Sequence, residues 1–430
     1  MSEWFMPTHA IERLGVMEQV KGLHYVANGP PQVFIGELCE IMDHQQQLIM
    51  TAEVTGFKEG KVYLMPHGHQ PVHMGYPIRG TGKPLDVPVG DVLTGRMVNA
   101  FCQPIDKLGP IKFTQQLACM PNPINPLDRL PISEQLATGI NALDSLMPLG
   151  QGQRIGLFAG SGVGKSTLLG LMAGSIQSDI NVIAFIGERG REVNDFIQQH
   201  LTDTLRQKTV IVAACSDEPP LIRRQAIYTA TTIAEYFCQK GLHVALFIDS
   251  ITRFAMAQRE ISLSLGESPT ARGYTPSCFA RLPGIVERAG RFLDKGSITG
   301  IYTILVEGDD FNEPIADNMR ALLDGHVVLS RALAQQGCYP AISITESISR
   351  LQKQLLTPEQ LNIAQKIFSI FSLVHQNREL IDLGAWHKGH NPRLDEALEC
   401  IEPLKNIVYQ GTQTPLTLDE LWATLSEIVS

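Results

Sequence analysis

The fold of this chain is decided by one stretch, Arg154-Ile155-Gly156-Leu157-Phe158-Ala159-Gly160-Ser161-Gly162-Val163-Gly164-Lys165-Ser166-Thr167. It opens on the kind of apolar run that forms a strand buried on both faces. An apolar helical pattern begins at Leu168, directly after the lysine and the two hydroxyl residues. Glycines between a strand and a helix let successive backbone N–H groups turn inward and surround phosphate oxygens. The order therefore predicts a phosphate-binding P-loop, with Ala159 at the position of the pattern's first glycine.

The predicted loop supplies backbone and side-chain contacts for a nucleotide. Lys165 is expected to reach the β- and γ-phosphates, and the Ser166 hydroxyl to take a position on Mg²⁺. The glycine spacing does not fit the dinucleotide fingerprint, and the flanking strand and helix favour a P-loop over a structural glycine-rich turn. The residues that we expect to bind the nucleotide here are Gly160, Ser161, Gly162, Val163, Gly164, Lys165, Ser166 and Thr167.

Two carboxylates follow further apolar runs. Asp249 ends the run that begins at Val244, which is the Walker B arrangement in which an acid helps to hold Mg²⁺. An acid there can also be a helix cap, but its company with a P-loop favours the Mg²⁺ site. Glu188 follows the run 181–186, where ligands collect at the sheet edge. It can orient an attacking water as a general base, or it can belong with Arg189 to a structural Arg–Glu network, and the spacing leaves both open.

The pattern of apolar residues divides the chain. Short β-rich runs at 33–38, 48–54 and 61–65 predict a small barrel or sandwich. From about residue 150 to 345, apolar runs alternate with helical stretches, which predicts a parallel sheet covered by helices. A stripe at helical spacing near the C-terminus comprises Leu361, Ala364, Ile367, Phe371 and Val374. We therefore expect a barrel-like domain at 1–77, an α/β nucleotide-binding domain at 78–345 and a helical domain at 346–430.

Composition narrows the class of protein. The formal net charge is −9, whereas proteins that bind duplex DNA normally carry a basic excess. No apolar run approaches the roughly 18 residues needed to span a bilayer, and Met1–Phe5 lacks the features of a secretory signal. The 8 cysteines contain no C-x-x-C pair, which predicts free thiols in a reducing compartment. These observations predict a cytoplasmic protein that does not span a membrane.

Three closely spaced histidines, His67, His69 and His73, suggest a metal site. Histidine is a common metal ligand, but no carboxylate or cysteine lies near these three in the sequence. Glycine and proline between them favour a loop, so metal binding is the less favoured interpretation.

Beyond these motifs, the sequence resembles the hexameric rotary-type ATPases. The resemblance rests on the P-loop and on the segments 187–193, 249–254 and 272–277. Two more segments, 305–317 and 323–331, are similar to the ATPases of type III secretion and flagellar export rather than to ATP synthase subunits. The resemblance to this family covers about residues 87–390. The resemblance implies a RecA-like P-loop NTPase core with a parallel sheet, preceded by a small β-barrel and followed by helices.

The resemblance also implies roles for individual residues. Glu188 matches the family's catalytic carboxylate, and Arg189 matches a neighbour of the γ-phosphate. Tyr339 matches an aromatic residue that packs on adenine, and Arg350 an arginine finger given across a subunit interface, worth about three to five orders of magnitude in rate. The implied catalytic set is Lys165, Glu188, Arg189 and Arg350, with Mg²⁺ held by Ser166 and Asp249. The segment 266–276 matches one near the central channel.

The implied function is ATP hydrolysis that powers type III protein secretion by releasing and unfolding chaperone-bound substrates. The implied partners are five further copies in a homo-hexamer, stator and central-stalk proteins, and chaperone–substrate complexes. Its implied place is the cytoplasm, peripheral to the inner membrane at the export gate. Three alternatives stay open: flagellar export within the same family, a hexameric nucleic-acid-translocating ATPase, and a non-catalytic regulatory subunit. The negative charge counts against the second, and Glu188 counts against the third.

Overall fold

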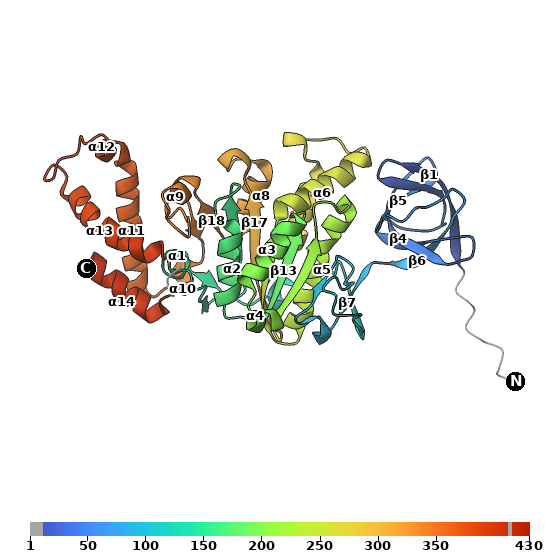
Figure 1. Cartoon of the computed structure of the whole chain (residues 1–430), viewed down its shortest axis with the longest axis horizontal. Coiled ribbons are helices and arrows are strands. Elements are labelled where there is room, and N and C mark those ends of the chain that lie inside the picture. The colour runs from blue at the N-terminus through green and yellow to red at the C-terminus, as the bar shows by residue number, and fades with distance from the viewer. Residues whose placement is uncertain (1–11, 412–414) are drawn as a thin grey trace.

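A computed structural model of the chain describes residues 12–411 and 415–430. A β-barrel, a central body built on a parallel sheet and a group of helices follow one another along the long axis (Figure 1). This arrangement confirms the predicted fold class. Residues Met1–Phe5, from which the absence of a secretory signal is predicted, lie outside the described part of the chain.

Six strands close the N-terminal barrel in the order β1-β2-β5-β4-β3-β6. They span β1 (Arg13–Lys21), β2 (His24–Asn28), β3 (Glu37–Met42), β4 (Leu48–Lys58), β5 (Lys61–Pro66) and β6 (Pro77–Pro84). Along β4 the side chains of Met50, Ala52 and Val54 are buried, as strand alternation requires when one face lines a barrel core.

The barrel differs from the sequence prediction in two places. The predicted strand at 33–38 begins only at Glu37, because the chain turns at Gly36, whose φ is +90°. The closing strand β6 reaches Pro84, so the barrel continues past the expected boundary at residue 77. Strands β1 and β2 were not among the predicted runs. The division into three domains at residues 77 and 345 stays a prediction.

The central body is built on a 9-stranded sheet whose order is β19-β18-β12-β17-β15-β13-β14-β8, with β16 beside β17. The long parallel strands are β12 (Arg154–Ala159), β13 (Ile180–Ile186), β14 (Thr209–Ala214), β15 (His243–Asp249), β17 (Ser297–Leu305) and β18 (Gly325–Leu329). Four of them confirm the apolar runs predicted from the sequence. The short strands of this sheet are β8 (Met97–Val98), β16 (Gly290–Arg291) and β19 (Ile348–Ser349). Two separate two-stranded sheets pair β7 (Asp86–Val89) with β9 (Gln115–Ala118), and β10 (Gln135–Leu136) with β11 (Leu149–Gly150).

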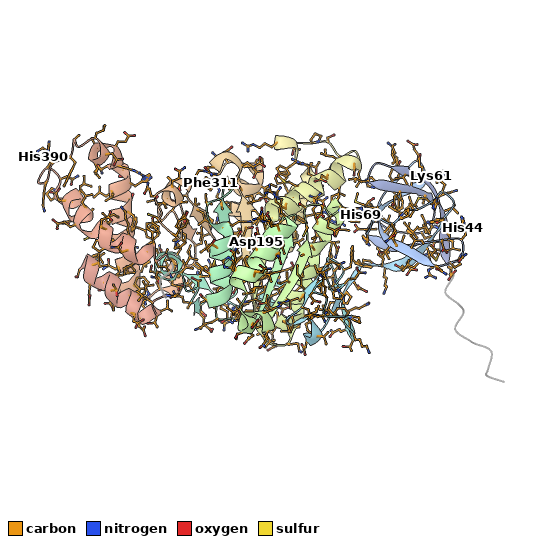
Figure 2. All side chains as sticks on the ribbon, in the orientation of Figure 1. His44, Lys61, His69, Asp195, Phe311 and His390 are labelled. Atoms are coloured by element: carbon orange, nitrogen blue, oxygen red, sulfur yellow. The ribbon has the colours of Figure 1, made fainter. Side chains whose placement is uncertain are left out.

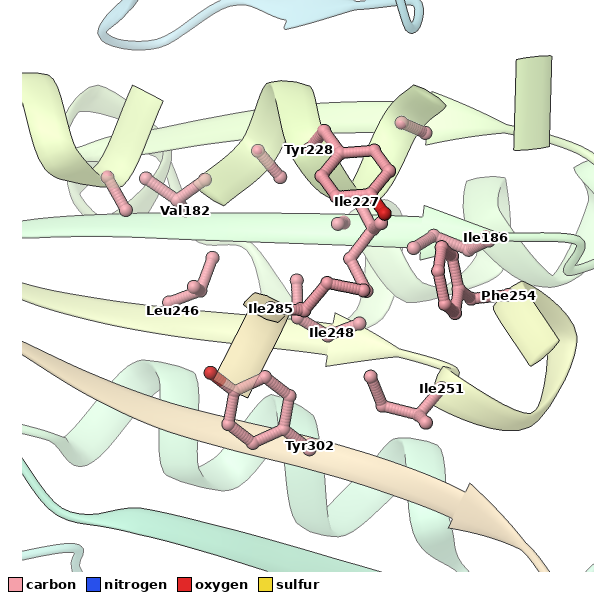
Figure 3. Close-up of a cluster of buried hydrophobic side chains, with 14 of the residues drawn as sticks. Val182, Ile186, Ile227, Tyr228, Leu246, Ile248, Ile251, Phe254, Ile285 and Tyr302 are labelled. Carbon is pink, nitrogen blue, oxygen red and sulfur yellow. The ribbon is translucent and has the colours of Figure 1, made fainter. Parts of the chain in front are cut away.

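Both faces of the sheet are buried. On one face, strand residues such as Val182 and Ile186 pack on α5 (Pro220–Gln239), α6 (Ile251–Ser264), α7 (Pro276–Val286) and α8 (Pro314–Leu322). Figure 3 shows part of this cluster, in which Ile227 and Tyr228 come from α5 and Val182 and Ile186 from β13. On the other face, Ile183 and Phe185 pack with α1 (Asn141–Leu146), α2 (Lys165–Ser175), α3 (Gly190–His200) and α4 (Asp203–Gln207). Burial on both faces explains the uninterrupted apolar runs.

The last part of the chain is helical and comprises α9 (Arg331–Gln335), α10 (Gln352–Leu355), α11 (Pro358–Gln376), α12 (Arg378–Asp382), α13 (Pro392–Val408) and α14 (Leu418–Val429). Residues of α11, α13 and α14 pack in the same apolar cluster as α1 to α4. The predicted stripe lies on α11, where Ala364, Ile367 and Phe371 are buried. Helix α11 begins at a capping box made by Thr357 and Gln360. Within the described ranges, no helix has both the length and the apolar character needed to cross a membrane.

Candidate active site

The predicted site residues lie at the carboxyl ends of neighbouring parallel strands. The P-loop follows β12, Glu188 follows β13 and Asp249 ends β15, and β12, β17, β15 and β13 are adjacent in the sheet. Because parallel strands present their carboxyl ends at one edge, these residues meet in one crevice. Helices α2 and α3 start at that edge, after β12 and β13 respectively.

The P-loop has the backbone conformation that its glycines allow. Gly162 and Gly164 have φ of 78° and 94°, in the left-handed region that side chains disfavour. Helix α2 then begins at Lys165, so its free N–H groups face the loop. Among the predicted loop residues, Val163 differs from the others because its side chain points into the core. It is 1% exposed and packs in the core, so only its backbone can contribute to phosphate binding.

Lys165 joins the two predicted carboxylates. Its Nζ donates a hydrogen bond to Asp249 Oδ1 and lies 3.8 Å from Glu188 Oε1. All three side chains are nearly buried, with exposed fractions of 11% for Lys165, 11% for Glu188 and 4% for Asp249. Asp249 also accepts a hydrogen bond of 2.7 Å from the Thr303 hydroxyl on β17. The lysine charge therefore compensates Asp249 more directly than it compensates Glu188.

Glu188 is the carboxylate whose charge is less compensated, and its pKa is raised as a result. Burial raises the pKa of the Glu188 carboxyl to about 7 and Asp249 adds to the rise, while Lys165 and Arg253 act in the opposite direction. Its Oε1 is buried and accepts no hydrogen bond from the described residues. A buried acceptor without a partner costs free energy. The role of Glu188 as the catalytic carboxylate stays a prediction.

Lys165 and Glu188 line a cavity of about 630 Å³, whereas Asp249 is not among its lining residues. Its walls include the predicted residues Gly160, Ser161, Gly162, Gly164, Lys165, Ser166, Thr167, Glu188 and Arg189. They also include residues to which the sequence analysis gave no role, namely Glu192, Thr252, Arg253, Met256, Leu305, Val306, Glu307, Gly308 and Arg331. Most of these also follow the ends of β13, β15, β17 and β18, so the carboxyl-edge rule could have singled them out.

Three residues that the resemblance assigns lie at or outside the rim of this cavity. The Arg189 side chain is 80% exposed, with Nη1 3.4 Å from Glu192 Oε1. Tyr339 is 44% exposed, and a Cβ atom on Gly164 would lie 3.6 Å from its ring, so the ring lies beside the P-loop. Arg350 is not in the cavity. It follows β19 and its Nη2 donates to the Arg320 carbonyl at 2.9 Å. Its role as a finger stays a prediction.

The donor set suits Mg²⁺ bound together with a nucleotide. Ser166 and Asp249 offer a hydroxyl and a carboxylate, which are hard oxygen ligands. Among the described residues no group of three or more His, Cys, Asp or Glu forms a metal cluster. Mg²⁺ usually takes one or two carboxylates plus substrate phosphates rather than a protein cage, so the residues present fit that ion.

The three N-terminal histidines have separate surroundings. His67 contacts Thr51 Oγ1 through its Nδ1 at 2.9 Å and packs against Phe101, and burial lowers its pKa to about 4. His69 lies on the side of the barrel that faces the central body (Figure 2), with its Nε2 4.0 Å from Glu218. His73 packs against the ring of Tyr76.

Two parts of the chain match the models of known protein families. Residues 139–349 match the ATP synthase alpha/beta family, nucleotide-binding domain, and residues 356–427 match the T3SS EscN ATPase C-terminal domain. The chain is 45% identical to the flagellum-specific ATP synthase of Bacillus subtilis (strain 168), over 98% of this chain and 96% of that relative. It is 40% identical to the type 3 secretion system ATPase of Xanthomonas euvesicatoria, over 94% of this chain and 89% of that relative.

A solved structure extends the likeness to the whole fold. The assembled ATPase EscN of the enteropathogenic E. coli type III secretion system superimposes with a TM-score of 0.91 at 37% identity. The match covers 97% of this chain and 100% of that one. Sequence identities of 37–45% over 94–98% of the chain show common descent. The chain therefore belongs to the family of flagellum-specific ATP synthases and type III secretion system ATPases.

Proposed function

We propose that this chain hydrolyses MgATP to drive export of proteins through a type III apparatus, releasing and unfolding chaperone-bound substrates. The observation that carries the proposal is the buried group of Lys165, Asp249 and Glu188 at the P-loop. A lysine shared by two acids, one of which has no hydrogen-bonding partner among residues 12–411 and 415–430, is a costly arrangement unless a nucleotide and a water complete it.

The residues divide the work of phosphoryl transfer. The P-loop amides and Lys165 bind the phosphates, and Lys165 stabilises the charge that develops on the transferred group. Glu188 in its carboxylate form accepts a proton from the attacking water and holds that water in line. Ser166 and Asp249, the latter oriented by Thr303, would hold Mg²⁺, which supplies charge neutralisation on the phosphate oxygens when bound. Arg189 at the rim is suited to approach the γ-phosphate.

A shared site explains why Arg350 lies outside the cavity of its own chain. We infer a homo-hexamer in which a neighbour's Arg350 completes the site and Tyr339 packs on adenine. The relative EscN has been solved assembled, and also in complex with its central stalk EscO. A central stalk, stator proteins and chaperone–substrate complexes are the partners that follow for this chain. Such a chain would work in the cytoplasm, peripheral to the membrane that carries the export gate.

The test couples hydrolysis to export. The purified chain is expected to hydrolyse ATP only with Mg²⁺, and a strain that carries Lys165→Ala is expected to lose secretion of its type III substrates. Lys388→Ala, the same change at an exposed lysine, serves as the matched control with normal secretion. Secretion that survives Lys165→Ala would overturn the proposal. Stimulation of hydrolysis by single-stranded nucleic acid would favour the alternative of a nucleic-acid motor.

A further inference from the structure

An ion pair between Asp309 and Arg331, two residues without an assigned role, lies next to the P-loop. Asp309 lies in the turn after β17, and Arg331 begins α9 directly after β18. Arg331 Nε lies 3.1 Å from Asp309 Oδ2, and the two side chains are 46% and 43% exposed. The pair therefore links two elements at the carboxyl edge of the sheet, at the rim of the nucleotide cavity.

The pair contacts the P-loop itself. A Cβ atom on Gly160 would collide with the Asp309 carboxylate and lie 2.9 Å from Arg331 Nη2. Gly160 thus lies directly under the pair, and the absence of a side chain there makes the close approach possible. Arg331 is also part of the cavity wall. A guanidinium group consequently lies beside the loop whose amides are suited to bind phosphate.

The turn that carries Asp309 is held against the site. The Val306 amide donates to the Ala159 carbonyl at 3.0 Å, and the Leu305 amide donates to Thr252 Oγ1 at 2.9 Å. Asp309 has φ of 56°, a left-handed conformation that costs energy for a residue with a side chain. The surrounding contacts therefore impose a strained backbone that places this carboxylate on Arg331.

The next residue has a different partner. Asp310 pairs with Arg272, which belongs to the segment 266–276, rather than with any group of the nucleotide cavity. Two adjacent aspartates thus bind two different arginines. Of these two aspartates, Asp309 is the one that pairs with Arg331 beside the P-loop.

Arginine binds phosphate in the same two-pronged manner as it binds carboxylate. We propose that Arg331 exchanges Asp309 for a phosphate of the bound nucleotide, so that Asp309 competes with the nucleotide and promotes its release. Arg331 is then a phosphate-binding residue, and Asp309 is a positioning residue that acts through it. This inference rests on the proposed function, because it assumes that a nucleotide triphosphate is the ligand.

Equilibrium binding of a fluorescent ATP analogue to the full chain, with Mg²⁺ and at about 0.15 M salt to screen remote charges, tests the exchange. Arg331→Gln is expected to weaken binding by about tenfold or more, because a charge-assisted contact is lost. Asp309→Asn is expected to tighten binding about two- to fivefold, because an exposed competing pair is removed. The double variant is expected to bind within about twofold of Arg331→Gln alone. Asp310→Asn, the same change one residue on, is the matched control and is expected to bind like the unmodified chain.

Each contrary outcome has a distinct meaning. Unchanged binding by Arg331→Gln would overturn the inference while leaving the proposed function intact, provided that the unmodified chain binds and hydrolyses ATP. Additive effects of the two substitutions would show that Asp309 acts independently of Arg331 and would overturn the exchange. Equal effects of Asp309→Asn and Asp310→Asn would overturn it too, because the charge of the turn would then matter rather than the pair. A chain that binds no ATP would refute the proposed function itself.

Discussion

Glu188 is a buried carboxylate that must be ionised to act as a base, and its surroundings set the pH at which this happens. Because its pKa is raised to about 7, the carboxylate form is lost as the pH falls through neutrality. We predict that kcat/KM for ATP falls about tenfold per pH unit below pH 7 and levels off above it. A pH series from 5.5 to 8.5 measures this, with Glu399→Gln expected to give the same curve. A flat profile across this range would contradict the assigned role.

Thr303 is a residue whose contribution rests on one hydrogen bond. Its hydroxyl donates to Asp249 at 2.7 Å from a fully buried position on β17. Thr303→Val keeps the shape and removes this donor, so Asp249 loses its fixed orientation. We predict that apparent Mg²⁺ affinity or ATPase activity falls about ten- to hundredfold, which is the usual cost of losing a hydrogen-bonding partner of a metal ligand. Activity as a function of Mg²⁺ concentration measures it, and an unchanged curve would remove Thr303 from the site.

Site residues at the ends of strands can be predicted from the sequence, whereas residues that reach the site only through tertiary contacts cannot. Lys165, Glu188 and Asp249 are predictable because each follows an apolar run that ends at the sheet edge. Thr303 is not predictable in this way, because it lies within a buried strand and becomes relevant only through the pairing of β15 with β17. Arg331 likewise gains its meaning from a turn 22 residues earlier in the chain.

At the scale of elements, strand β4 of the barrel is joined to helix α5 by a buried ion pair. Glu53 bonds to Arg224, whose side chain is 2% exposed. Although burial acts to raise it, the pKa of Glu53 is lowered because Arg224 lies beside it. Met65 of β5 adds an apolar contact with Leu221 and Ile261 of the central body. These contacts fix the barrel on the side of the body that carries α5 and α6.

We predict that Arg224→Met destabilises the chain by about 3–5 kcal/mol, because it leaves the Glu53 charge buried without its partner. The double variant Glu53→Gln with Arg224→Met is expected to recover most of this loss, because no buried charge is left alone. Urea unfolding of the unmodified chain and of these two variants measures the free energy of unfolding. Equal losses in the single and double variants would show that packing rather than charge matters at this junction.

The elements also differ in how far the sequence predicts them. The strands β13, β14 and β15 are buried on both faces and therefore appear as uninterrupted apolar runs. Strand β6 contains Gly80, Gly82 and two prolines and has low strand propensity. It is a strand because β1 and β3 pair with it on either side, which is a non-local cause. The runs predicted at 33–38, 48–54 and 61–65 therefore do not include β6.

At the scale of the whole molecule, Lys165 and Arg350 lie in different places on one chain, and a neighbour must bring them together. We predict that Lys165→Ala and Arg350→Ala are each inactive alone and regain part of the activity when mixed under conditions of subunit exchange. Some interfaces of a mixed ring would then hold an intact Lys165 and an intact Arg350. ATP hydrolysis by mixtures over a range of ratios measures this. Activity that stays at the level of the separate variants would argue against a shared site.

The central claim is that this chain hydrolyses ATP with Glu188 as the base, and Glu188→Gln tests it most directly. The substitution keeps the size of the side chain and removes only the carboxylate. We predict that the full chain carrying it binds ATP within about twofold of the unmodified affinity. Steady-state hydrolysis of ATP in the same preparation is expected to fall at least about a hundredfold, the contribution of a general base. Hydrolysis at the unmodified rate by Glu188→Gln would contradict the account.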